Sequence, residues 1–148
     1  MDDDETAAVR GILDRAAAET RELRHGFIGS EHLLLALFGA PGGRAARRLE
    51  AAGAGYEAVR AQIVRIVGVG DEPVSAQQIL PYTPHAVAVV RQVRREAERS
   101  RSEAIGTEHV LRAVLRRRES LAVSVLEECG VDPRSLADEL RHARSDDE

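Results

Sequence analysis

The feature that most constrains the fold of this chain is an internal repeat. Residues 28–32 read Ile-Gly-Ser-Glu-His and residues 105–109 read Ile-Gly-Thr-Glu-His, an offset of 105 − 28 = 77 positions. The offset holds without a gap on both sides of the motif, where identical pairs include Glu19 and Glu96, Leu34 and Leu111, and Leu49 and Leu126. Fixed spacing over this distance indicates that one structural unit is present twice.

Each copy is expected to contain four helices. In the first copy, apolar residues recur at helical spacing from Val9 to Ala16, which predicts an amphipathic helix over 6–24. Three more helices are expected: one that Ser30 caps and that runs through the leucines to Phe38, one over 44–52 and one over 56–67.

The second copy repeats this plan. Helix starts are predicted at Thr83, Thr107 and Asp132, whose side chains can cap a first turn, and proline follows the first and the third of them. We therefore expect an all-α fold, in which two pseudo-symmetric four-helix repeats form one compact eight-helix domain over 1–148. The repeats would span about 6–68 and 83–144, joined by a linker over about 69–82.

The composition excludes several classes of function. All 21 basic residues are arginine, so the chain has no lysine for a Walker A loop or for Schiff-base chemistry. It also has no Gly-x-Ser-x-Gly motif, and we expect no enzymatic activity. A net charge of −4 argues against a nucleic-acid partner, and the lack of an 18-residue apolar run argues against a membrane span. The lone Cys129 fits a reducing, cytoplasmic location.

The Glu-His pair in each motif allows more than one interpretation. Adjacent residues on a helix point about a hundred degrees apart, and no further ligand lies nearby in sequence, so we expect no metal and no other cofactor. His32 and His109 are predicted to pack or form hydrogen bonds. For Glu31 and Glu108, stabilisation of a helix start would explain a carboxylate. A binding role is the alternative, since a carboxylate beside free helix N–H groups would suit a phosphorylated guanidinium.

The doubled motif, the leucine-rich helix after it and the Pro81-Tyr82-Thr83-Pro84 segment resemble the Clp repeat (Clp N) domain of ClpC-type Hsp100 unfoldases. The resemblance covers about residues 6–144. It implies a non-catalytic module that captures adaptor or substrate proteins for the ClpP system.

The resemblance also suggests where ligands would bind. It implies that Glu31 and Glu108, with Ser30 and Thr107 beside them, form sites for the guanidinium of phosphoarginine. It further implies that Tyr82 and Thr83 belong to a surface that binds peptides or peptide antibiotics.

Three alternatives stay open at this point. The chain contains no ATPase module and begins with Met1, so we expect a stand-alone paralogue that could act as a decoy competing with a full-length ClpC-type unfoldase. A small helical DNA-associated regulator is an alternative from another class, which the net charge disfavours. A metal-dependent hydrolase is the third.

Overall fold

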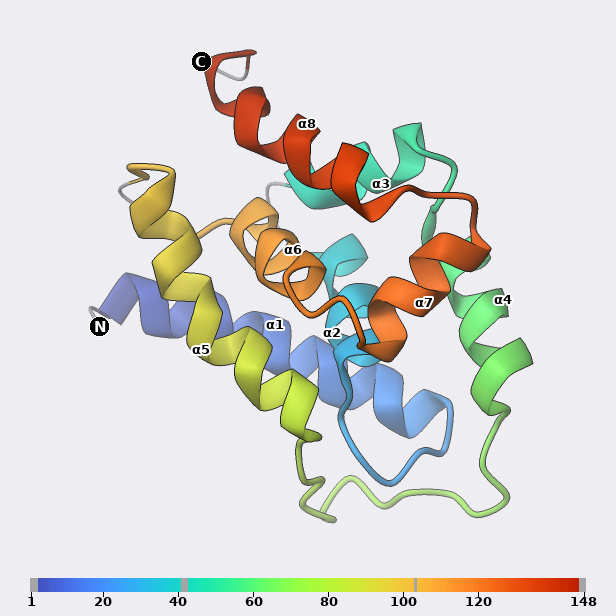
Figure 1. Ribbon diagram of the computed structural model, residues 1–148. Coiled ribbons are helices and arrows are strands. Elements are labelled where there is room, and N and C mark those ends of the chain that lie inside the picture. The colour runs from blue at the N-terminus through green and yellow to red at the C-terminus, as the bar shows by residue number, and fades with distance from the viewer. Residues whose placement is uncertain (1–2, 41–42, 103, 147–148) are drawn as a thin grey trace.

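The computed structural model describes residues 3–40, 43–102 and 104–146, which form an all-α fold (Figure 1). The α-helices within these residues are α1 Asp3–Glu22, α2 Ser30–Ala36, α3 Arg44–Ala51, α4 Tyr56–Val67, α5 Pro84–Arg99, α6 Thr107–Leu115, α7 Leu121–Glu128 and α8 Pro133–Asp146. A 3-10 turn, Leu37–Gly39, follows α2. The expected all-α class with four helices in each copy is confirmed. None of the described helices is long and apolar enough to cross a membrane.

The second helix of each repeat lies at the centre of the molecule (Figure 1). Helix α2 contacts α1, α4, α5, α6 and α7, and α6 contacts α3, α5, α7 and α8. Leu33, Leu34 and Leu35 follow one another on α2 and are all buried, as is Leu111 on α6. A helix that is apolar on nearly every side has to be enclosed by others, which explains why the leucine-rich segments form the core.

The two repeats cover each other through their third helices. Helix α3 of the first repeat packs on α6 of the second, and α7 of the second packs on α2 of the first. Thr107 Oγ1 accepts a hydrogen bond from the backbone N–H of Ala45 on α3 at 3.1 Å. Ser30 Oγ accepts one from the N–H of Ala122 on α7 at 3.2 Å. Each hydroxyl therefore caps a helix of the other repeat.

This exchange corrects one prediction. We expected Ser30 and Thr107 to cap their own helices, but the N-cap positions are occupied by Gly29 and Gly106, whose backbone is extended. The two hydroxyls lie at the first helical residue, and they satisfy orphan N–H groups at the start of α7 and α3. By contrast, Thr83 caps its own helix as expected, accepting from the N–H of Ala86 at 3.2 Å.

The loop over 68–83 returns along the end of α1 and places Tyr82 beside the first motif. The N–H of Ile28 donates to the carbonyl of Pro81 at 2.8 Å, and the N–H of Thr83 donates to the carbonyl of Ile28 at 3.0 Å. Farther back, the N–H of Gly70 donates to the carbonyl of Leu23 at 2.9 Å. These bonds hold the loop against the segment that leads into α2.

Candidate functional site

The histidine of each motif is a buried residue that holds the start of its helix. His32 is 1% exposed and His109 is 2% exposed. The Nδ1 atom of His32 accepts a hydrogen bond from the N–H of Gly29 at 2.9 Å, and that of His109 accepts from the N–H of Gly106 at 2.8 Å. The predicted hydrogen-bonding role of both histidines is confirmed.

In the first repeat, two more hydrogen bonds continue from His32, and each ring accepts a hydrogen bond at Nδ1 and donates one from Nε2. Because a backbone N–H only donates, His32 carries its proton on Nε2 and donates to Nδ1 of His25 at 2.9 Å. His25 then donates from Nε2 to the carbonyl of Gly68 at 2.8 Å. Burial, with a smaller contribution from His25, lowers the pKa of His32 to about 3. Burial also lowers the pKa of His109, whose Nε2 lies 3.1 Å from Ser102 Oγ.

The glycine of each motif makes room for the glutamate carboxylate. A Cβ on Gly29 would lie 2.1 Å from Oε1 of Glu31, and one on Gly106 would lie 2.0 Å from Oε1 of Glu108. Gly29 has φ −103°, which any residue adopts, so the missing side chain is what matters here. The Gly-x-Glu spacing thus folds each carboxylate back over its helix start, where the helix dipole favours it. Partial burial raises the pKa of Glu31, opposed by its own backbone N–H and by His25.

The two glutamates differ in what faces them. Oε2 of Glu108 lies 3.0 Å from Nη1 of Arg44, the first residue of α3 in the other repeat. The 77-residue offset puts Leu121, the first residue of α7, at the position equivalent to Arg44. Among the described residues, no arginine forms an ion pair with Glu31. A guanidinium from within the chain therefore pairs with the second carboxylate, whereas the described residues offer none to the first.

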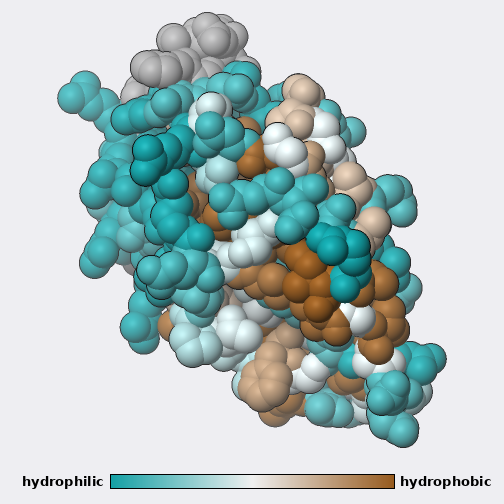
Figure 2. Space-filling view, turned by 45° about the vertical axis from the view of Figure 1, so that its right-hand side comes forward, coloured by the Kyte–Doolittle hydropathy of each residue, from teal (hydrophilic) through white to brown (hydrophobic). Residues whose placement is uncertain are grey.

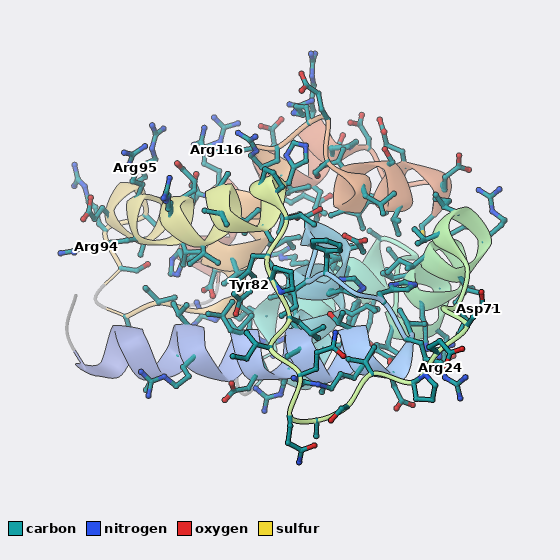
Figure 3. The ribbon with its side chains drawn as sticks, turned by 90° about the horizontal axis from the view of Figure 1, so that it is seen from below. Arg24, Asp71, Tyr82, Arg94, Arg95 and Arg116 are labelled. Atoms are coloured by element: carbon teal, nitrogen blue, oxygen red, sulfur yellow. The ribbon has the colours of Figure 1, made fainter. Side chains whose placement is uncertain are left out.

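The surface beside the first motif is apolar. Tyr82 is 40% exposed and lies between α1 and α5 (Figure 3), and Phe27 and Ile79 are 59% and 92% exposed. Ile66, Val67 and Val69 are also exposed at the end of α4. Figure 2 shows hydrophobic residues gathered at the centre right and in the lower part of the face that it presents. The structure thus brings Tyr82 and Thr83 close to the first motif.

Ser30 and Thr107 lie inside the molecule, 2% and 5% exposed, with their hydroxyls bonded to the opposite repeat. A direct part for them in ligand binding stays a prediction. The described residues contain no cluster of three or more side chains suited to hold a metal ion.

Sequence reasoning missed Arg44 and His25. A signal for both lay in the repeat itself, because Arg44 aligns with Leu121 and His25 aligns with Ser102.

Known proteins of one family are similar to this chain over most of its length. A model of the Clp repeat (R) N-terminal domain family matches residues 5–120 and 81–146. The chloroplastic chaperone protein ClpC of Pisum sativum is 35% identical over 125 residues, which is 84% of this chain and 13% of that protein. The chloroplastic ClpC1 of Oryza sativa subsp. japonica matches with the same identity and coverage. The chain thus spans about an eighth of the length of these relatives.

Solved structures show the same fold. The Hsp104 N-terminal domain from Candida albicans superimposes with a TM-score of 0.70 at 14% identity, covering 92% of this chain and 88% of that one. The N-terminal domain of ClpD from Arabidopsis thaliana gives 0.65 at 16% identity, covering 94% and 92%. The ClpV N-domain, solved in complex with a VipB peptide, gives 0.63 at 19% identity, covering 99% and 94%.

Proposed function

This chain belongs to the Clp repeat N-terminal domain family, and on that premise we propose that it is a non-catalytic module that captures protein partners of the Clp system. The partners would be adaptors or substrates of a ClpC-type unfoldase. A peptide complex of the ClpV N-domain, which shares this fold, supports a peptide-binding role. So do the exposed Phe27, Ile79 and Tyr82, because apolar side chains held on a rigid scaffold are common in peptide-binding surfaces.

The binding site that the geometry supports best is the carboxylate of Glu31. The observation that carries this proposal is the contact of Arg44 with Glu108, which places a guanidinium 3.0 Å from the pseudo-equivalent carboxylate. Glu31 has the same glycine-backed position at a helix start, and the residue that aligns with Arg44 in the repeat is Leu121. An arginine side chain of a partner would complete at Glu31 the pair that Arg44 completes at Glu108. Phosphoarginine presents the same guanidinium with added negative charge.

Calorimetric titration with free phosphoarginine tests this proposal, using the variants Glu31→Gln and Glu108→Gln. Losing a charge-assisted pair costs on the order of 1.5 to 3 kcal/mol, so we expect Glu31→Gln to bind at least about tenfold more weakly than the wild type. Glu108→Gln is the matched control and should bind like the wild type. No heat with the wild-type protein, or equal weakening in both variants, would contradict an open site at Glu31.

The decoy role is a separate proposal about the same module. A domain that takes the same partners as a full-length unfoldase would compete with it for them. Adding this protein to a ClpC-type unfoldase at work on an adaptor-dependent substrate should then slow degradation in proportion to its concentration. Unchanged degradation at a large excess of the domain would dismiss competition, while the binding role would stand.

A further inference from the structure

A concave surface lies in the second repeat, beside the C-terminal end of α6. It is a cleft of about 450 Å³, lined by residues of α5, α6, α8 and the segment after α6. Five arginines contribute to its wall: Arg112, Arg116, Arg118, Arg134 and Arg141. Arg116 lies on the side of α5 that is turned away from α1 (Figure 3). Neither Glu31 nor Glu108 lines this cleft.

The buried carboxylate in the cleft is compensated by more than one arginine. Glu96 is fully buried, with Oε1 bonded to Nε of Arg116 and also accepting from Nε2 of Gln92 at 3.1 Å. Its Oε2 lies 3.4 Å from Nε of Arg112 but accepts no hydrogen bond from the described residues. One negative charge therefore meets two guanidinium groups, and an acceptor atom stays unsatisfied beside the cleft.

The outer part of the cleft adds to the positive charge. Asp138 pairs with Arg141, whereas neither Arg118 nor Arg134 forms an ion pair with any carboxylate of the described residues. The lining as a whole sets five guanidinium groups against two carboxylates, an excess of three positive charges on a molecule whose net charge is −4. A concave surface focuses such a field onto whatever occupies it.

The fold does not require these arginines. The first repeat has the pseudo-equivalent cleft, about 330 Å³, where Leu35 and Gly39 stand at the positions of Arg112 and Arg116. There Glu19, the counterpart of Glu96, accepts hydrogen bonds from the Tyr56 hydroxyl at 2.8 and 3.0 Å. The remaining three arginines align with Pro41, Glu57 and Val64. The same helix packing thus forms without an arginine at these five positions, and the first-repeat cleft has one lining arginine, Arg15, which aligns with Gln92.

We propose that this cleft binds a small, multiply charged phosphate compound of the pyrophosphate class. Guanidinium groups donate paired hydrogen bonds that match phosphate oxygens, and the volume falls within the range of small-molecule sites. Convergence of five arginines on one compact volume suits a dense anion better than an extended acidic peptide, whose charges are spread along the chain. The site goes beyond partner capture at Glu31 and does not depend on it.

Titration with inorganic pyrophosphate at constant ionic strength tests the proposal. Arg118→Ala/Arg134→Ala removes the two lining arginines that form no ion pair with the described residues, while Arg60→Ala/Arg91→Ala removes the same charge from α4 and α5 outside the cleft. We expect the first double variant to bind at least about tenfold more weakly, and the second to bind within about twofold of the wild type. Equal thermal melting of the three proteins would show that folding is unaffected.

Titration with ADP distinguishes a site for the phosphates alone from a site for a nucleotide. ADP that binds as tightly as pyrophosphate supports a site for the phosphates alone, and tighter binding supports a nucleotide. Binding should persist in Glu31→Gln, which separates this site from the one proposed above. The proposal is overturned if the wild type does not bind pyrophosphate, if both double variants weaken equally, or if a glutamate-rich peptide binds more tightly than pyrophosphate.

Discussion

At the scale of single residues, a row of hydrogen bonds through two histidine rings links three segments. Gly29 donates to His32, His32 donates to His25, and His25 donates to the carbonyl of Gly68. A proton added to Nδ1 of His32 would face the N–H of Gly29, which is itself a donor. The loop end at Gly68, the end of α1 and the start of α2 are therefore held together by hydrogen bonds that require a neutral His32.

The hydrogen bonds of His32 predict a loss of stability in mild acid. The pKa of His32 is about 3 in the folded chain, below its ordinary value near 6.5. The unfolded chain therefore binds more protons, and the stabilisation is complete above pH 6.5 and declines as the pH falls towards 3. Between pH 7.5 and 5, we expect the free energy of unfolding to fall by about 2 kcal/mol through His32.

Urea unfolding of the wild type and His32→Asn at several pH values measures this effect. In His32→Asn, most of the difference in the free energy of unfolding between pH 7.5 and 5 should be lost. His85→Asn replaces a histidine on α5 that takes no part in these hydrogen bonds, and it should keep the difference. A pH dependence that is the same in all three proteins would contradict the assignment of neutral His32.

The motif glycine offers a way to move a carboxylate without changing its chemistry. Alanine at position 29 would place Cβ 2.1 Å from Oε1 of Glu31, and the flexible carboxylate rather than the backbone has to shift. We expect Gly29→Ala to lose at most about 1 kcal/mol of stability, since its φ and ψ suit alanine. Binding of phosphoarginine should weaken about as much as in Glu31→Gln. Normal binding by Gly29→Ala, measured by calorimetry, would show that the carboxylate position is unimportant.

At the scale of helices, the caps exchanged between repeats determine how the third helices dock. Ser30→Ala would leave the buried N–H of Ala122 without its acceptor, so we expect a loss of about 1 kcal/mol in the free energy of unfolding. Ser124→Ala on the exposed side of α7 is the control and should change stability by less than about 0.5 kcal/mol. Equal stability of the two variants in urea titrations would contradict the exchange of caps.

The helix starts were predictable where the cap and its partner are neighbours in sequence. Thr83, Pro84 and Ala86 lie within four positions, and the local pattern suffices to place the start of α5. Ser30 caps a residue 92 positions away, and Arg44 pairs with a residue 64 positions away. Such contacts depend on how the helices pack in space, which no local pattern encodes. The sequence therefore predicted the helices and the place of both glutamates in a first helical turn, but not that one of them pairs with an arginine of the other repeat.

At the scale of the whole molecule, each repeat completes the core of the other. Leu34 on α2 and Leu111 on α6 are pseudo-equivalent and both fully buried. We expect Leu34→Ala and Leu111→Ala each to lower the free energy of unfolding by about 2 to 5 kcal/mol. Because α3 and α7 pack across the repeats, each variant should still unfold in one transition. Two separate transitions, seen by calorimetry or by probes placed in each repeat, would contradict this interdependence.

The two copies have kept one framework and diverged in charge. Arg44 pairs with one motif carboxylate while Leu121 stands at the equivalent place, and five arginines line one cleft whereas one, Arg15, lines its equivalent. A pseudo-symmetric molecule of this kind presents different surfaces from the same helix arrangement. The central claim is that it contains one open carboxylate and one closed by its own arginine.

The stoichiometry of phosphoarginine binding tests that claim most directly. Wild-type protein should bind one equivalent in a calorimetric titration, and Arg44→Ala should bind two because it uncovers Glu108. Combining Arg44→Ala with Glu31→Gln should return the value to one. Two equivalents in the wild type, or one equivalent in Arg44→Ala, would contradict the account.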